Sequence, residues 1–441
     1  MTPTHALSPQ GTSPRFTTLR EWLAWQESLH AKEIELGLDR CRAVAERMQV
    51  IQPRYATVSV AGTNGKGSSV AMLDSILSAA GYRVGRYTSP HLIRYNERIR
   101  VAGEIADDAT ICAAFDRIDR ARGEISLTYF EFGTLAALDI FMHAGIDVAI
   151  LEVGMGGRLD AVNLVDADVA LIATIDIDHV DFLGSDRESI GREKAGIMRA
   201  RRPAVCSDPS PPNSLIEHAR GVGTVLYVLG EEYGYEIGAG SWSWHGAGRV
   251  MKDLPPPHLH GAFQFQNAAG VLRAIEALAP RCPVSRRAIE TGLRNVQLAG
   301  RYQVYPGEVA WILDVAHNPQ SARVLAETLR NEQVCSGRTH FLAGMLKDKD
   351  IGGVFSVLHD LADEWYLVTL AARRGATAAA LREQLRIHSP RVPAHLYDSI
   401  PEAYQAVSAA VRPGDRVLVF GSFLTVAGVA DILERAGRAS D

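Results

Sequence analysis

A glycine-rich turn between a strand-like run and a helix-like run is the feature that most constrains this chain. The turn is Gly62-Thr63-Asn64-Gly65-Lys66-Gly67-Ser68; it follows the β-branched run 57–61 and precedes apolar residues at helical spacing in 68–80. Glycine lets backbone N–H groups approach an anion at a helix N-terminus, and Lys66 adds a point charge. The sequence therefore predicts a phosphate-binding turn and, with it, a nucleoside triphosphate site.

The turn departs from the usual spacing of a phosphate-binding loop. The common pattern has a glycine where this chain has Val60, and Ser or Thr where it has Gly67. A plain glycine turn with a solvated lysine is the alternative. The flanking strand and helix favour the phosphate interpretation, because that is the context in which such a loop works.

Length and composition exclude several classes of protein. With 441 residues the chain exceeds one ordinary core, so two domains are expected. A net charge of −5 does not indicate the basic surface that binds nucleic acid, and no apolar stretch is long enough to span a bilayer. Five scattered cysteines, 41, 112, 206, 282 and 335, suit a reducing cytoplasm. Residues 1–15 contain prolines and glycine without an apolar signal core, and we expect a flexible tail there.

The pattern of apolar runs predicts an α/β fold in two parts. Residues 1–296 are expected to form a P-loop-type domain with a mostly parallel sheet, and residues 297–441 a Rossmann-like α/β domain. Within 207–260, prolines and the alternation of Trp242 and Trp244 suggest hairpins, hence a small β-rich subdomain. The expected strands are 57–61, 83–88, 148–153, 169–175, 203–206, 309–313, 339–343, 365–368, 394–397 and 416–420.

Polar residues follow several of these strands, where ligands gather in parallel sheets. Glu152 ends an apolar run and suits Mg²⁺, although it could equally pair with Arg158. His179 is either a structural residue or a ligand. Lys194, within a helix-like segment, would ordinarily be a surface lysine.

Two further groups of polar residues are candidates. Ser89 lies in a turn among basic residues of 83–100, and its hydroxyl could reach a metal. Arg301, Asp314 and His317 are the most polar positions next to apolar runs of the second half. Taken separately, none of these residues identifies a function.

Taken together, the motifs resemble the folylpolyglutamate synthases, in particular the bacterial form that is also a dihydrofolate synthase. The glycine loop is shared with the related Mur ligases, which accounts for its spacing. The resemblance runs from about residue 20 to the C-terminus and is carried by these segments: 62–68, 89–92, 95–99, 151–154, 156–161, 188–196, 266–268, 314–319 and 421–423.

The resemblance implies roles for individual residues. Lys66, His179 and Lys194 would be catalytic, and Lys194 would carry a carbamate that helps to hold magnesium. The expected ATP contacts are Thr63, Asn64, Gly65, Lys66, Gly67, Ser68, Asn267, Arg301 and Asp314. The expected metal ligands are Ser89, Glu152, His179 and the carbamate of Lys194.

The same resemblance implies a pterin site and a glutamate site. His317 and Ser422 are expected to contact the incoming glutamate. In the segment expected to bind dihydropteroate, Glu33 and Glu35 stand where Thr and Asp would be expected, so the resemblance supports glutamate ligation more strongly than dihydropteroate use. The expected pterin residues are Glu33, Ile34, Glu35, Thr128, Tyr129, Phe130, Glu131, Leu159, Asp160 and Ala161.

The implied reaction is ATP-dependent addition of L-glutamate to dihydropteroate and to the γ-carboxyl of reduced folates, through an acyl phosphate. Two Mg²⁺ ions and ATP as co-substrate are expected, with room for a monovalent cation. We expect a cytoplasmic monomer that acts on small molecules. The alternatives are a folylpolyglutamate synthase without the dihydropteroate activity, a Mur-type cell-wall ligase and an ATP-driven switch that ligates nothing.

Overall fold

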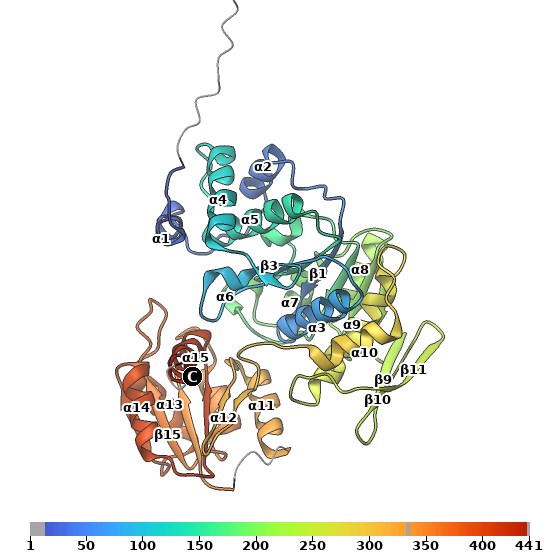
Figure 1. Ribbon diagram of the computed structural model, residues 1–441. Helices are drawn as coiled ribbons and strands as arrows, with labels where there is room; N and C mark the ends of the chain where they lie inside the picture. The colour runs from blue at the N-terminus through green and yellow to red at the C-terminus, as the bar shows by residue number, and fades with distance from the viewer. Residues whose placement is uncertain (1–13, 332–335, 439–441) are drawn as a thin grey trace, which may run out of the picture.

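The computed structural model describes residues 14–331 and 336–438. These residues form an N-terminal lobe, with elements up to residue 295, and a C-terminal lobe, with elements from residue 303 on; each lobe has its own large sheet (Figure 1). Most of the expected tail, and Cys335, lie outside the described residues. Arg15, expected to belong to the tail, is instead anchored, since its Nε donates to Asp119 at 2.7 Å.

The large sheet of the N-terminal lobe has eight strands. They are β1 (Ala56–Ala61), β2 (Val84–Tyr87), β3 (Ile99–Val101), β4 (Glu104–Ile105), β5 (Val148–Glu152), β6 (Val169–Ile172), β7 (Pro203–Cys206) and β8 (Val225–Val228). Their order is β4-β3-β2-β5-β1-β6-β7-β8. Within this order, the six strands β2-β5-β1-β6-β7-β8 pair in parallel, and β3 and β4 add an antiparallel edge.

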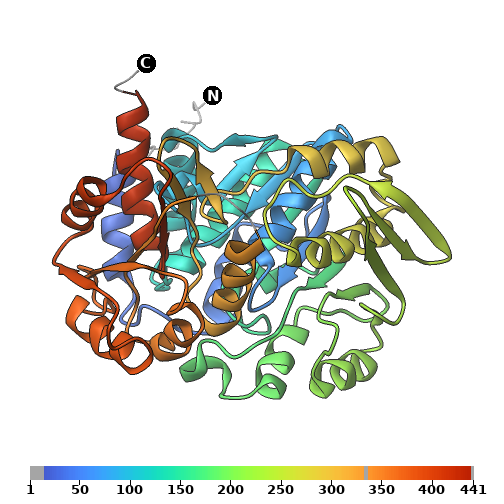
Figure 2. The ribbon, with the colours of Figure 1, turned by 90° about the horizontal axis from the view of Figure 1, so that it is seen from below.

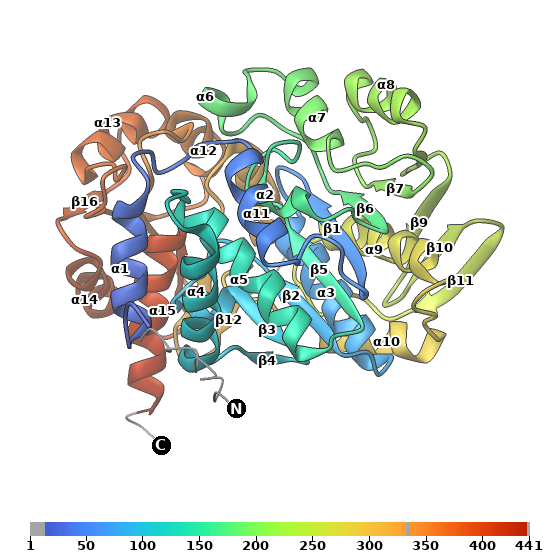
Figure 3. The same ribbon diagram turned by 90° about the horizontal axis from the view of Figure 1, so that it is seen from above.

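Helices cover both faces of this sheet, so β1 and β5 are buried throughout. The helices are α1 (Leu19–Leu29), α2 (Asp39–Arg47), α3 (Lys66–Ala79), α4 (Asp108–Arg122), α5 (Tyr129–Ala144), α6 (Val180–Leu183), α7 (Arg187–Ala195), α8 (Asn213–Val222), α9 (Phe263–Leu278) and α10 (Arg286–Asn295), with 3₁₀ turns η1 (Tyr95–Arg98) and η2 (Ala161–Leu164). One core contains α3, α9 and α10, and the other contains α1, α2, α4 and α5. Side chains alternate between the two cores along a strand, as with Ile150 and Leu151. Helices α6, α7 and α8 follow one another along one side of the lobe (Figure 3).

The expected β-rich subdomain is present but shorter than predicted. Strands β9 (Tyr233–Ile237), β10 (Trp242–Gly246) and β11 (Arg249–Leu254) form a three-stranded antiparallel sheet at the end of the molecule opposite the C-terminal lobe (Figure 2). Trp242 and Trp244 are buried in it. The prediction of hairpins was wrong for 213–228, where α8 and β8 continue the large sheet, because Leu215 and Ala219 give that segment a buried helical face.

The C-terminal lobe has a six-stranded sheet in the order β12-β13-β17-β14-β15-β16. Its strands are β12 (Gln303–Tyr305), β13 (Ala310–Leu313), β14 (Thr339–Ala343), β15 (Glu364–Val368), β16 (Ala394–Tyr397) and β17 (Arg416–Phe420). Only β12 pairs antiparallel. Helices α11 (Pro319–Asn331), α12 (Ile351–Leu358) and α13 (Ala378–His388) cover one face, and α14 (Ile400–Ala410) and α15 (Phe423–Arg438) the other.

The predicted α/β class is confirmed, and strands 203–206, 339–343, 394–397 and 416–420 have the predicted bounds. The predicted domain boundary at 296/297 falls between α10 and β12. No described helix is long and apolar enough to cross a membrane. The C-terminal ends of strands from both large sheets open onto one cavity of about 540 Å³.

Candidate active site

The glycine turn joins β1 to α3 as predicted, and the geometry requires two of its glycines, Gly62 and Gly65. Gly65 has φ +86°, and a Cβ there would lie 2.5 Å from Oδ1 of Asn267. Gly62 has φ +152°, and a Cβ there would lie 2.8 Å from Cβ of Ala173. The first N–H groups of α3 have no acceptor within the helix, so they are available to an anion.

Lys66 lies inside this turn. Its ammonium donates to the carbonyl oxygens of Gly62 at 3.0 Å and Thr63 at 3.3 Å. Burial lowers the pKa of Lys66, and the carboxylate of Glu152 acts in the opposite sense. The alternative of a solvated lysine is therefore excluded, and a partly buried cation faces the cavity.

Glu152 lies at the end of β5 and lines the same cavity as Lys66. Burial raises the pKa of this carboxyl, whereas Lys66, Arg301 and a backbone hydrogen bond from Ser89 lower it. Arg158 does not pair with Glu152; its Nη2 contacts Oε1 of Glu193 at 2.7 Å. The predicted alternative of a Glu152–Arg158 pair is thus wrong.

His179 and Lys194 also line the cavity. His179 adopts a left-handed conformation, φ +54°, directly before α6. Burial, together with the nearby charge of Lys349, lowers the pKa of His179 to about 4, so its imidazole is neutral and free to bind a cation. Lys194 is 3% exposed rather than on the surface. Burial, aided by the charge of Lys66, lowers the pKa of Lys194 to about 7. A large share of this amine is therefore uncharged and nucleophilic near neutral pH.

These donors fit a hard divalent cation. Among the described residues, no three His, Cys, Asp or Glu side chains gather into a ready-made metal site. The cavity instead offers a carboxylate from Glu152, an imidazole from His179, a hydroxyl from Ser89 and the amine of Lys194. A small protein ligand set of this kind is typical of Mg²⁺ sites that are completed by phosphate oxygens and water.

A second, smaller cavity of about 150 Å³ adjoins the glycine turn. It brings together Asn267 from α9 with Arg301 and Asp314 from the C-terminal lobe. Asp314 accepts from the backbone N–H groups of Tyr302 at 2.8 Å and Ala316 at 2.7 Å. Burial raises the pKa of Asp314 and the Arg301 charge lowers it. Arg301 lines both cavities and so connects them.

The residues expected at the pterin site lie close together. All ten are described by the structure, and Glu33 is the one of them that lines the larger cavity. Thr128 and Glu131 cap α5 reciprocally, and Glu131 pairs with Arg40 at 3.1 Å. The N–H of Gly37 donates to Leu159 at 3.2 Å, which ties the segment containing Glu33, Ile34 and Glu35 to the turn before η2.

Asp160 holds that turn together. Its carboxylate accepts from the N–H groups of Met155 and Val162, both at 2.9 Å. Burial raises the pKa of Asp160 to about 7, although these hydrogen bonds act to lower it. Ala161 is buried just after it, and Phe130 packs against Gly154. Phe130 and Asp160 thus support, from behind, the part of the cavity wall formed by Gly154 and Met155.

His317 and Ser422, expected at the glutamate site, both line the larger cavity. A ring nitrogen of His317, Nδ1, lies 2.7 Å from the carbonyl oxygen of Val315, so Nδ1 carries the proton. Ser422 Oγ lies 2.8 Å from Oγ1 of Thr425 and accepts from its backbone N–H.

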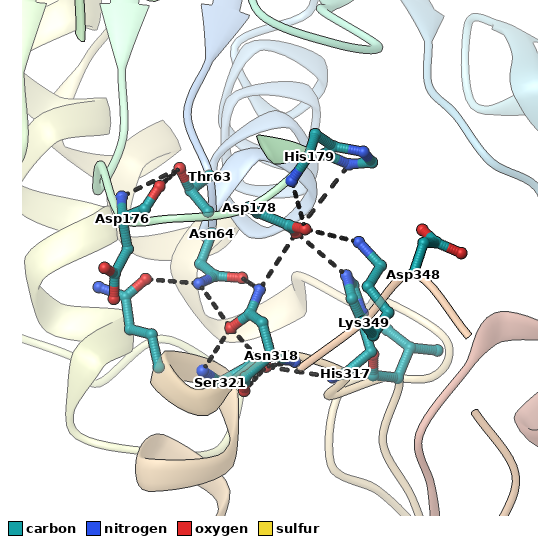
Figure 4. Close-up of polar contacts among 12 residues, drawn as sticks. Thr63, Asn64, Asp176, Asp178, His179, His317, Asn318, Ser321, Asp348 and Lys349 are labelled. Atoms are coloured by element: carbon teal, nitrogen blue, oxygen red, sulfur yellow. Dashed lines mark hydrogen bonds and ion pairs between the residues drawn. The ribbon is translucent and has the colours of Figure 1, made fainter. Parts of the chain in front are cut away.

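A polar network joins the lobes beside the glycine turn (Figure 4). Nζ of Lys349 lies 2.7 Å from Oδ1 of Asp178, and Nε2 of His317 lies 3.6 Å from Oδ2. Burial raises the pKa of Asp178, but its contact with His317 and the charge of Lys349 hold it well below its usual range. Asn64 also exchanges hydrogen bonds with Asn318, at 3.3 and 3.2 Å.

Two protein families match the chain: the Mur ligase middle domain at residues 60–207 and the glutamate ligase domain of Mur ligases at residues 300–423. The dihydrofolate synthase/folylpolyglutamate synthase of Escherichia coli is 44% identical over 97% of each chain. The chain belongs to the dihydrofolate synthase/folylpolyglutamate synthase family. The family predicted from the motifs is thereby confirmed, and the cell-wall ligase alternative is not supported.

Solved structures of this family share the fold. E. coli FolC in complex with DHPP and ADP has a TM-score of 0.90 and 44% identity, covering 97% of this chain and all of that one. A bifunctional folylpolyglutamate synthase/dihydrofolate synthase with Mn, AMPPNP and L-glutamate bound has a TM-score of 0.87 and 43% identity, with coverage of 97% and 100%.

In this family member the sequence did not reveal Asp178, Lys349 and Asn318 as site residues. Asp178 precedes His179 directly, and that adjacency was the available signal. Lys349 belongs to the charged run 347–350, which is typical of a solvated loop, although its side chain is only 8% exposed. The burial arises from contact with the other lobe, which no local pattern encodes.

Proposed function

We propose that this protein adds L-glutamate to dihydropteroate and to the γ-carboxyl of reduced folates, using ATP and an acyl phosphate. The observation that carries this proposal is a single cavity in which a phosphate-binding turn meets Glu152, His179 and Lys194, with His317 and Ser422 on the facing lobe. The 44% identity to the E. coli enzyme over nearly the whole chain supports the same function.

The residues suit activation of a carboxylate. A carboxylate is a poor acyl donor until one of its oxygens is phosphorylated, so the protein must bring two anions together. Lys66 and the N–H groups at the start of α3 neutralise the transferring phosphoryl group, as preorganised donors do in phosphoryl transfer. No protein nucleophile is required.

We assign ATP to both cavities, because Arg301 lines each of them. The triphosphate lies on residues 63–68, and the base and ribose reach Asn267 and Asp314. Ser89, Glu152, His179 and a carbamate on Lys194 hold Mg²⁺, which offsets phosphate charge when bound. Two Mg²⁺ ions are the proposed complement, with room for a monovalent cation.

The lobe contacts have a role in this scheme. The Asp178–Lys349 pair and the Asn64–Asn318 hydrogen bonds hold the C-terminal lobe against the glycine turn. Closure of this kind excludes water, which would otherwise hydrolyse the acyl phosphate. His317 and Ser422 then contact the incoming glutamate from the C-terminal lobe.

The pterin is assigned to the wall formed by 33–35, 128–131 and 159–161. We further propose two domains, 1–296 and 297–441, and a monomer in the cytoplasm. The free cysteines Cys41, Cys112, Cys206 and Cys282 support that compartment.

One incubation with ATP, Mg²⁺, L-glutamate and either dihydropteroate or tetrahydrofolate, analysed by mass, tests the proposal. We expect a glutamyl product with both acceptors, ADP release that requires acceptor and glutamate together, and transfer of ¹⁸O from the acceptor carboxylate to phosphate. A product with tetrahydrofolate but not with dihydropteroate would refute the dihydrofolate synthase activity and retain the folylpolyglutamate synthase activity. ATP hydrolysis indifferent to both substrates would refute ligation.

A further inference from the structure

The larger cavity has a basic rim that the proposed ligation chemistry does not use. Arg373 and Arg374 line it from the turn between β15 and α13. The backbone carbonyl of Arg374 accepts from Lys347 N–H at 2.8 Å, and Ala376 N–H donates to Met345 at 2.9 Å. This turn is therefore fixed against the neighbouring loop, and the two guanidinium groups are presented at a defined place.

Arg374 holds two weak carboxylate partners at this rim. Its Nη1 lies 3.3 Å from Oδ2 of Asp348, and its Nη2 lies 3.7 Å from Oε1 of Glu33 on the N-terminal lobe. Arg374 is 43% exposed and Glu33 is 57% exposed, so water screens the pair. Arg373 makes no ion pair within the described part of the chain. Both arginines can therefore accept another carboxylate.

The two proposed acceptors differ in the charges they would bring to this rim. Dihydropteroate carries only the carboxylate that reacts. A reduced folate carries, in addition, one α-carboxylate for each glutamate already attached. Arginine binds carboxylates through a planar fork of N–H donors, whereas the partly buried Lys66 is assigned to the nucleotide end of the cavity.

We propose that Arg373 and Arg374 bind the α-carboxylates of the glutamate tail of a folate, and that Glu33 competes with the tail for Arg374. The inference rests on the proposed function and extends it to substrate choice. Glu33 belongs to the segment assigned to the pterin, but its carboxylate reaches the rim, where a tail must displace it from Arg374, so it favours the acceptor without a tail. Removal of its charge shifts preference toward folates with a tail.

The test compares Arg373→Ala, Arg374→Ala and Glu33→Gln in the full chain. Acceptors are dihydropteroate and tetrahydropteroyl mono- and triglutamate, with KM and kcat measured for each. We expect either arginine variant to raise KM for the folates about threefold to fivefold, the range for an exposed charge pair, and more for triglutamate. KM for dihydropteroate stays within about twofold in the arginine variants. Glu33→Gln lowers KM for the folates.

Arg382→Ala is the matched control, because Arg382 on α13 is 45% exposed and is not part of the cavity lining. It leaves every KM unchanged, and Arg374→Lys recovers part of the lost affinity. Equal changes for mono- and triglutamate and for dihydropteroate would overturn the inference. So would a change confined to KM for L-glutamate, or a Glu33→Gln effect of the same sign as Arg374→Ala. Failure of the unaltered protein to ligate either acceptor would instead refute the proposed function.

Discussion

Replacement of Lys66 by methionine tests the central electrostatic role of the glycine turn. Methionine retains most of the apolar stem and removes the ammonium group, with both its charge and its N–H donors. The ammonium contacts two carbonyl oxygens, at 3.0 and 3.3 Å, and no carboxylate within ion-pair distance among the described residues. Glu152 acts on the ammonium only from beyond ion-pair distance, so its positive charge is available to phosphate.

The magnitude follows from this geometry. A unit charge 4 Å from a phosphate oxygen contributes about 4 kcal/mol at an effective dielectric constant of about 20. The carbonyl contacts of Lys66 are present before ATP binds, so part of that attraction is offset. Loss of one preorganised contact costs about 10²- to 10³-fold in kcat, and we expect a loss of that order.

The assay is ADP release in the presence of acceptor and glutamate, with the glutamyl product confirmed by mass. Lys252→Ala, at an exposed position on β11, is the control and retains full turnover. We expect the Lys66→Met variant to fold. Burial disfavours the charged form of Lys66, as its lowered pKa indicates, and removal of the charge relieves this desolvation cost. A folded Lys66→Met protein with kcat within about threefold of the unaltered chain would refute the reasoning.

Three other perturbations have defined outcomes. Gly65→Ala places a Cβ 2.5 Å from Oδ1 of Asn267 at φ +86°, so KM for ATP rises about tenfold or more while Tm falls; an unchanged KM would contradict the geometry. Burial and the Arg98 charge lower the pKa of His91 to about 4 from 6.5, so the unfolded chain binds more protons between these values and stability falls as pH drops from 6.5 to 4. His91→Asn therefore shows a smaller fall in Tm over that range, and parallel Tm profiles would refute this. Lys194 reacts with CO₂, giving a carbamate ¹³C signal with labelled bicarbonate that Lys194→Met lacks; equal signals would exclude the modification.

The glycine turn and the strand ends could be predicted because their signals are local. Glycines, a lysine and an apolar run fix β1, the turn and α3, and parallel strands place Glu152 near His179 at one edge of a sheet. The remaining candidate residues come from the family motifs read together, and their roles stay predictions. What a single segment encodes was therefore readable from the sequence.

Burial that depends on distant segments could not be predicted in the same way. Helix α7 is polar along its length, so Lys194 resembled a surface lysine, yet the turn containing Gly157 packs against the backbone of this helix at Lys194. The Asp178–Lys349 pair depends on how two lobes meet, which requires the tertiary structure.

Arg301 belongs to the walls of both cavities. A nucleotide in the smaller cavity and an acyl group in the larger one would thus face a single guanidinium, that of Arg301. Release of ADP from the smaller cavity would then change the charge that the acyl ligand meets in the larger one, because both ligands face the same side chain.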